Sequence, residues 1–311
     1  MARLLLRVMA PVSAPRQTLP ASTYLVTRRC TQRQFLLRPS ALVNQIFAYC
    51  VALAAERTGV LVHALCVLSD HWHGVLTDVQ GRLPEFEETV HKLVAKCVNA
   101  SLGRWENLWS SEAPSAVRLE DDGAVLDRIV YTLCNPTAAG LVAFGKEWPG
   151  LRTRPRDIAG SETVIRRPAV FFREDGATPE TVVLRIVPPV IEGMTGAEVA
   201  AEIETRVAER ERELRDEAAR TGRSFLGRRA VLEQEPSGSP TSREPHRKLS
   251  PRVAAADPAV RIAAIARIKQ FLLDYRGAFL KWKRGIRDVL FPHGTYALRL
   301  HAAVPCAPPD G

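Results

Sequence analysis

Residues 60–78, VLVHALCVLSDHWHGVLTD, hold two runs of apolar residues that are separated by Ser69 and Asp70. Serine and aspartate are typical turn residues, and the flanking runs are rich in residues that favour strands. This pattern predicts a β-hairpin, with one strand at 60–68 and the returning strand at 71–78.

The returning strand carries two of the chain's seven histidines, His71 and His73, on either side of Trp72. Side chains at positions i and i+2 of a strand lie on the same face, about 7 Å apart at the backbone. The two imidazoles should therefore lie side by side at a strand end, where they can share one metal ion, while Trp72 points to the other face. The alternative is that the pair arose by chance and has no ligand.

The segments around the hairpin alternate between strand and helix patterns. We expect a strand at 22–30, a helix at 39–59 with Ser40 as N-cap and Gly59 at its end, a helix at 83–103, a weak strand at 115–120, and a helix at 121–136 that begins at an aspartate cap and stops at Pro136. The order strand–helix–hairpin–helix–strand–helix predicts an α+β fold, in which helices pack on an antiparallel sheet.

The last of these helices carries a tyrosine away from its apolar stripe. At about 100° per residue, Tyr131 lies almost opposite the stripe, and Asn135, four residues later, lies beside it with Asp127 and Arg128. The stripe itself consists of Leu126, Ile129, Val130 and Leu133. Tyr131 and Asn135 are thus free for another role. The alternatives are a half-exposed tyrosine that covers the sheet edge and an asparagine that caps the helix before Pro136.

Composition narrows the class of protein. The chain has 311 residues and a formal net charge of +9, which favours a polyanionic partner such as nucleic acid. Six cysteines without a CxxC pair, lying in apolar segments, indicate buried, reduced thiols in a cytoplasmic protein and not a zinc knuckle or a disulfide framework. No apolar run is long enough for a membrane span.

The composition changes along the chain and indicates several units. We expect a disordered leader at 1–19, the α+β domain at 20–150, a mixed strand and helix extension at 151–232, a flexible linker at 233–258, and a basic helical segment with a terminal strand at 259–311. In the last unit the helical stripe of Ile268, Leu272, Tyr275 and Phe279 should form a core, with stacking on nucleic-acid bases as the alternative.

Four segments together resemble the single-tyrosine transposases of the HUH endonuclease class, in particular the REP-associated tyrosine transposases and their insertion-sequence relatives. They are TYLVTRRCTQRQFLL (23–37), VHALCVLSDHWHGVLTD (62–78), NASLGRWENLW (99–109) and YTLCNPTAAGLV (131–142). The histidine pair alone is a weak signal. The pair followed about 60 residues later by Tyr, Asn-Pro and Ala-Gly-Leu-Val is a strong one, and the likeness covers roughly residues 20–145.

The chain departs from the family pattern beside the histidines. The family usually has Pro-Asn before its first histidine, where this chain has Ser69 and Asp70. The residue between the histidines is usually small and aliphatic but here is Trp72, and the apolar residue after the second histidine is here Gly74. These changes concern the local packing of the strand.

The resemblance implies a ferredoxin-like or RRM-like core and a metal-dependent enzyme. Its cofactor would be Mg²⁺ or Mn²⁺, held by His71, His73 and, as a third ligand, Asn135. Tyr131 would be the nucleophile that attacks a phosphate of single-stranded DNA and forms a 5′-phosphotyrosine, so that DNA is cleaved and rejoined near hairpins.

The resemblance also implies a homodimer that binds single-stranded or hairpin DNA in the cytoplasm, associated with the nucleoid. Candidate phosphate contacts are Arg28, Arg29, Arg33, Lys92 and Lys96. The alternatives are a non-catalytic hairpin-binding relative, a replication initiator or relaxase with the same histidine pair, and a metallohydrolase that recruits His63 or His91 as further ligands.

Overall fold

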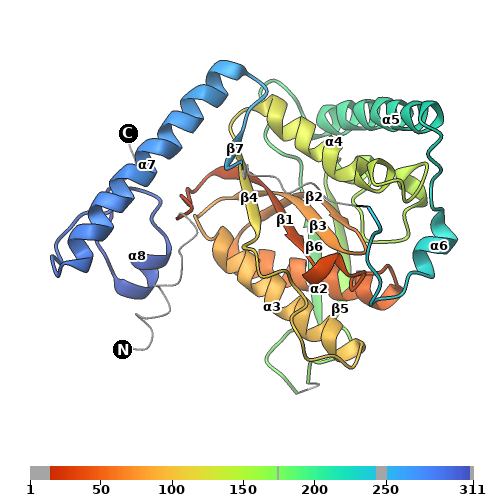
Figure 1. Cartoon of the computed structure of the whole chain (residues 1–311), viewed down its shortest axis with the longest axis horizontal. Coiled ribbons are helices and arrows are strands. Elements are labelled where there is room, and N and C mark those ends of the chain that lie inside the picture. Colours follow the sequence, from red (N-terminus) through yellow and green to blue (C-terminus); the bar gives the residue numbers. More distant parts are fainter. Residues whose placement is uncertain (1–14, 174, 243–250, 309–311) are drawn as a thin grey trace.

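A computed structural model describes residues 15–173, 175–242 and 251–308 of the chain. Its centre is a five-stranded sheet in the order β2-β3-β1-β4-β7 (Figure 1). The strands are β1 (Ser22–Arg29), β2 (Leu61–Val67), β3 (His71–Asp78), β4 (Ser115–Leu119) and β7 (Val253–Ala254). Only the pairing of β7 with β4 is parallel, and the other neighbours are antiparallel. The predicted α+β class is therefore confirmed.

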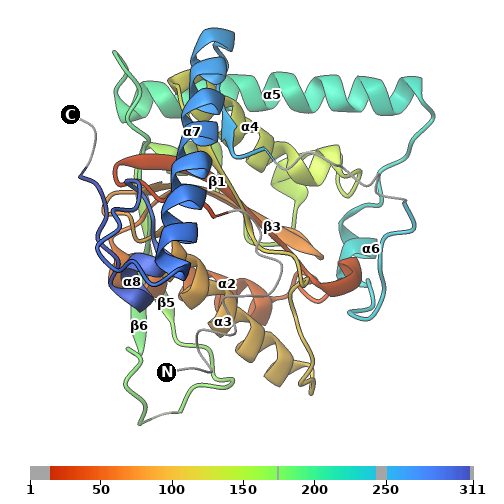
Figure 2. The same cartoon turned by 60° about the vertical axis from the view of Figure 1, so that its left-hand side comes forward.

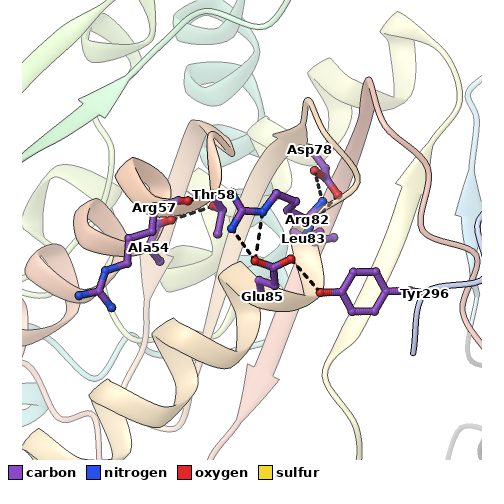
Figure 3. Close-up of polar contacts among 8 residues, drawn as sticks. All are labelled: Ala54, Arg57, Thr58, Asp78, Arg82, Leu83, Glu85 and Tyr296. Atoms are coloured by element: carbon purple, nitrogen blue, oxygen red, sulfur yellow. Dashed lines mark hydrogen bonds and ion pairs between the residues drawn. The ribbon is translucent and has the colours of Figure 1, made fainter. Parts of the chain in front are cut away.

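One face of the sheet is covered by α2 (Ala41–Thr58) and α3 (Leu83–Ser101), which also pack on each other (Figure 1). Ser40 caps α2 as predicted, by accepting a hydrogen bond from the Val43 N–H at 3.1 Å. The N-terminus of α3 is capped by a side chain that lies before the helix in the sequence. The Asp78 carboxylate accepts from the N–H groups of Arg82 and Leu83 at 2.8 and 2.7 Å (Figure 3).

The opposite face is covered by α4 (Asp122–Ala138), and α5 (Gly196–Arg220) packs on the outer side of α4 (Figure 1). The predicted stop at Pro136 is wrong, because α4 continues through this residue to Ala138. Proline removes one donor and crowds the preceding turn. Here the Arg152 guanidinium donates to the Leu133 carbonyl in that turn at 2.7 Å. Asn135 is consequently inside the helix and is not its cap.

Trp72 and Gly74 are matched to each other on the α2 and α3 side of β3. The indole is fully buried, lies 5.4 Å from the Phe47 ring between centroids, and donates to His91 at 3.3 Å. A Cβ atom at position 74 would lie 2.7 Å from the Trp72 ring and 3.2 Å from Leu65. The glycine therefore provides the space that the large indole occupies. The large residue at 72 and the small residue at 74 therefore compensate each other in volume.

The remainder of the chain adds a hairpin and a small helical unit. The hairpin of β5 (Ser161–Arg166) and β6 (Thr181–Ile186) packs beside α2. The other elements are the 3-10 turns η1 (Thr31–Arg33), η2 (Gly145–Glu147) and η3 (Pro155–Ala159) and the helices α6 (Arg228–Leu232), α7 (Pro258–Lys283) and α8 (Ala297–Ala302). In Figure 2, α7 stands upright in front of the rest of the molecule, with α8 near its lower end.

The C-terminal unit has a core of its own. Tyr275 and Phe279 of the predicted stripe pack against buried Phe291 and Leu298. The expected terminal strand is wrong. Residues 297–302, ALRLHA, are good helix formers and form α8. The unit is joined to α3 by the Tyr296 hydroxyl, which donates to Glu85 at 3.1 Å (Figure 3).

The expected leader and linker lie partly outside the described residues, which omit 1–14 and 243–250. Residues 15–19 lie beside the C-terminal unit, where the Thr18 N–H donates to the Gly294 carbonyl at 3.0 Å. Within the expected linker, the Gly238 carbonyl accepts a hydrogen bond from the Phe35 N–H at 2.9 Å.

Five of the six cysteines are buried, and all six are free thiols. None of the helices in the described parts of the chain is long and apolar enough to cross a membrane.

Glu87 of α3 is a buried acidic residue among the apolar side chains that α3 buries. Its side chain is buried, and its Oε1 atom has no hydrogen-bond partner among the described residues. Burial raises the pKa of this carboxyl to about 7, although the positive charges of Arg16 and Arg28 oppose the rise. The folded state therefore favours the neutral acid.

Gly74→Ala should destabilise the fold by about 1–3 kcal/mol, because the added methyl overpacks the site beside the indole. In a Trp72→Leu background the same change should cost clearly less, since the ring that it meets is gone. Urea unfolding of the four proteins in this cycle measures the coupling. Gly277→Ala is the control, because nothing lies near its added Cβ, and alanine there should stabilise α7. Equal costs of Gly74→Ala in both backgrounds would contradict the matching.

Glu87→Gln should change how the free energy of unfolding depends on pH. A raised pKa means that this carboxyl favours folding below its unfolded pKa near 4.5 and loses that contribution as pH rises through about 7. The variant should gain up to about 3 kcal/mol relative to the parent between pH 5 and pH 8. Glu88→Gln is the control, since it makes the same substitution at the next residue of α3, whose side chain is exposed. A difference between Glu87→Gln and the parent that does not change from pH 5 to pH 8 would refute the assignment.

Candidate active site

The two histidines begin strand β3 and share the face that α4 covers. Their ring centroids are 4.8 Å apart, and the rings meet edge to face at 85°. Trp72 points to the opposite side of the sheet, into the core under α2 and α3. The alternation expected from the sequence is thus present, and the two imidazoles lie side by side at a strand end.

Each histidine is held at its Nδ1 atom by a neighbour. The Asp70 carboxylate lies 2.7 Å from Nδ1 of His71, and the Thr27 hydroxyl lies 2.7 Å from Nδ1 of His73. Thr27 reaches His73 because the two residues are directly opposite in the β1–β3 pairing. Both bonds fix the orientation of a ring. The Asp70 carboxylate can only accept, so Nδ1 of His71 is the donor in the first bond and its Nε2 atom is the other ring nitrogen available to a ligand. The Thr27 hydroxyl can donate or accept, so the second bond orients His73 without assigning its tautomer.

The Nε2 atom of His73 is buried and has no hydrogen-bond partner among the described residues. Burial, and secondly the positive charge that His71 can carry, hold the pKa of His73 well below its usual range. His73 is therefore neutral at physiological pH, which is the form that binds metals. A buried, neutral and unpartnered imidazole nitrogen fits a metal ligand, so the residues present suit a divalent cation at Nε2.

Tyr131 of α4 lies against the histidine pair. Its ring centroid is 5.2 Å from that of His73, with the rings at 76°. The side chain is 42% exposed, so the phenol is open to a substrate. The Arg128 guanidinium lies over the same ring at 5.9 Å and places a positive charge beside it. Two residues that are 58 positions apart in the sequence are thus brought into contact, as the predicted site requires.

The third ligand stays a prediction. Asn135 lies one turn after Tyr131 on α4, and its side chain is buried. Among the residues that the structure describes, no three histidine, cysteine, aspartate or glutamate side chains form a group that could hold a metal ion. The histidines would supply at most two ligands to a metal ion, and a complete shell would need oxygen atoms from an amide such as Asn135, from water or from a substrate.

Two of the five predicted phosphate contacts lie beside the histidines. Arg29 is opposite His71 in the β1–β3 pairing. Arg33, in the turn after β1, has its Nε atom 3.9 Å from the Asp70 carboxylate. Both arginines therefore place positive charge at the end of the sheet that carries the candidate site.

The other three contacts lie on the α3 side of the sheet and are not brought to the histidines. Arg28 donates to the carbonyls of Ser110 and Glu112 at 3.0 and 2.7 Å. Arg28 and Lys96 line one surface hollow of about 420 Å³. Lys92 is exposed one turn earlier on α3. A DNA-binding role for these residues stays a prediction.

His63 and His91 are positioned by the core. Both ring nitrogens of His63 are engaged, by the Val187 carbonyl and the Thr77 hydroxyl at 2.8 Å each. His91 accepts from the buried Trp72 indole. The structure therefore gives no support to the metallohydrolase alternative. Thr27 is the site residue that sequence reasoning missed, and only knowledge of the strand pairing would have found it.

Comparison with known proteins gives one distant likeness. No family model and no curated protein matches the chain. A solved structure of a REP-associated tyrosine transposase bound to a REP hairpin aligns with 49% of this chain and 86% of its own, at 20% sequence identity and a TM-score of 0.37. A TM-score of this size carries no argument about function, so the functional argument rests on the residues described above. The chain is distantly similar to a structure of this class.

Proposed function

We propose that this protein is a metal-dependent endonuclease and strand-transfer enzyme of the tyrosine transposase type, acting on single-stranded DNA near hairpins. One observation carries the proposal. The exposed Tyr131 phenol lies against His73, whose buried Nε2 atom has no partner among the described residues. A nucleophile beside a prepared metal ligand is the arrangement that a phosphodiester cleavage by tyrosine needs.

His71 and His73 would hold the cation through their Nε2 atoms, with Asn135 as the proposed third ligand. Imidazole is a common ligand of transition-metal ions, and carbonyl oxygens such as that of an amide suit both Mg²⁺ and Mn²⁺. When bound, such an ion supplies a Lewis acid that neutralises charge on a phosphate oxygen. Asp70 and Thr27 orient the two imidazoles through their Nδ1 atoms, on the other edge of each ring from Nε2.

The reaction proposed for Tyr131 conserves the energy of the DNA backbone. Its phenolic oxygen forms a bond to the phosphorus as the bond from phosphorus to the 3′-oxygen breaks. The phenol loses a proton and the departing 3′-oxygen gains one, which leaves a 5′-phosphotyrosine and a 3′-hydroxyl. Attack of another 3′-hydroxyl on this linkage rejoins DNA without ATP and regenerates the tyrosine.

The charge around the site supports a DNA substrate. The chain carries a formal net charge of +9, and Arg29 and Arg33 lie at the same end of the sheet as the histidines. Backbone phosphates are bound by such cations. A hairpin substrate and a homodimeric protein belong to the proposal through the family resemblance. A non-catalytic hairpin-binding protein is the second candidate, favoured by the absence of a three-residue metal cluster of His, Cys, Asp or Glu in the described residues.

The purified protein should form a covalent adduct with labelled hairpin DNA taken from the flanks of its own gene. The adduct should form with Mn²⁺, fail with EDTA, and vanish in Tyr131→Phe, because the variant lacks the attacking oxygen. A denaturing gel detects it. Tyr275→Phe, which removes a phenol oxygen from the C-terminal unit, is the matched control and should form the adduct normally. Binding of the hairpin without an adduct under any metal would favour the non-catalytic candidate.

Thr27→Val should weaken Mn²⁺ binding by about 10- to 100-fold, as is typical when the outer partner of a metal-bound histidine is lost. The change keeps the shape and strand preference of residue 27 but leaves Nδ1 of His73 without its hydroxyl. The electron paramagnetic resonance signal of free Mn²⁺ measures the affinity. Thr23→Val is the control, since Thr23 also lies on β1 and makes a 2.7 Å bond to Thr77, six residues after His71 on β3. Equal effects of the two changes would refute the role given to Thr27.

A further inference from the structure

Trp105, in the loop between α3 and β4, is exposed without an evident structural reason. Its side chain is 93% exposed, whereas Trp72, Trp109 and Trp148 are all buried. Leaving so large an apolar surface in water forgoes the stabilisation that burial gives. An indole that contributes so little to the core is available to stack on a flat ligand.

The surface beside this indole is polar and hollow. Trp105 borders a depression of about 400 Å³ that is lined by Thr31, Gln32, Gln34, Glu106 and Asn107. Primary amides present a donor and an acceptor side by side, which is how side chains read the edges of bases. A flat aromatic face next to several amides matches one unpaired nucleotide, with its base stacked on the indole and its edge toward the amides.

The backbone under this hollow is strained. Gln32 and Arg33 have φ values of 49° and 57°, in the left-handed region that residues other than glycine seldom adopt. Two such residues in succession are costly, and conformations of this kind gather at functional sites. The strained turn holds the Gln32 side chain at the rim of the hollow beside Trp105.

Backbone hydrogen bonds connect the segments that line this hollow to the end of the sheet that carries the candidate active site. The Thr31 N–H donates to the Leu108 carbonyl at 2.8 Å, which ties the Trp105 loop to the end of β1. The Cys30 N–H donates to the Asp70 carbonyl at 2.7 Å, directly beside His71. The loop that carries Trp105 and the turn before His71 are therefore both tied to the same end of β1.

We infer that Trp105, with Gln32, Gln34 and Asn107, forms a binding site for one unpaired nucleotide of the substrate strand. Trp105 supplies stacking, and the amides distinguish the bases. This inference rests on the proposed function and adds to it a specificity site that is separate from Tyr131 and the histidines.

The test measures binding alone, in EDTA, so that neither a metal nor the cleavage step enters. Two fluorescent DNA probes are compared by anisotropy, a hairpin with an unpaired extension and the same hairpin with blunt ends. Trp105→Ala should weaken binding of the extended hairpin about ten-fold or more and leave the blunt hairpin unchanged. Trp105→Phe should restore most of the affinity, and the melting temperature should not change, because the residue is exposed.

A second variant tests the amides. Gln32→Gly keeps the left-handed backbone, relieves its strain and removes the side chain, so the protein should become more stable. When each position of the extension is varied through the four bases, the parent should prefer one base at one position. Gln32→Gly should reduce that preference about ten-fold. Unchanged preference together with an unchanged affinity in Trp105→Ala would overturn the inference.

The outcomes separate this inference from the proposed function. If Trp105→Ala binds both probes like the parent while the parent still forms the Tyr131 adduct, the nucleotide site is refuted and the proposed function stands. If Trp105→Ala loses affinity for the extended hairpin but no adduct forms with any metal, the nucleotide site stands and the catalytic proposal fails. A parent protein that binds neither probe refutes both.

Discussion

The antiparallel pairing of β1 with β3 is the constraint on which the candidate site depends. It sets Thr27 opposite His73 and turns both histidines toward α4. A slip of one residue would turn the histidines into the core under α2 and α3. The slip is opposed by Trp72, whose indole fills that core, and by Gly74, which leaves room for it. Trp72 and Gly74 therefore favour the register that presents the histidines.

The periodicity of strands and helices was enough to predict on which face the main residues of the candidate site lie. The two-residue period of a strand separated His73 from Trp72, and the helical period separated Tyr131 from the stripe that packs on the sheet. Both predictions follow from backbone geometry alone. The contact of Thr27 with His73 does not, because it joins residues 46 positions apart through strand pairing. Sequence patterns thus located the parts of the site, and the pairing of strands determined how they meet.

The two wrong predictions of secondary structure have different physical origins. Pro136 is a typical end of a helix, but α4 continues because it is packed between the sheet and α5, and Arg152 supplies a donor to the turn before the proline. Residues 297–302 were expected in a strand but form α8, whose Leu298 joins the core of the C-terminal unit. Local preference was outweighed at Pro136 and misjudged in α8. Because α4 packs against the sheet on one side and against α5 on another, Asn135 is buried although it lies outside the predicted apolar stripe.

The central claim is that His71 and His73 form a metal site beside the Tyr131 nucleophile. X-ray diffraction from crystals soaked in Mn²⁺, recorded where manganese scatters anomalously, tests it most directly. The account predicts an anomalous peak bonded to the Nε2 atoms of both histidines, on the side of the ring that faces Tyr131. Manganese bound elsewhere, or no peak between the two histidines at saturating Mn²⁺, would contradict the account.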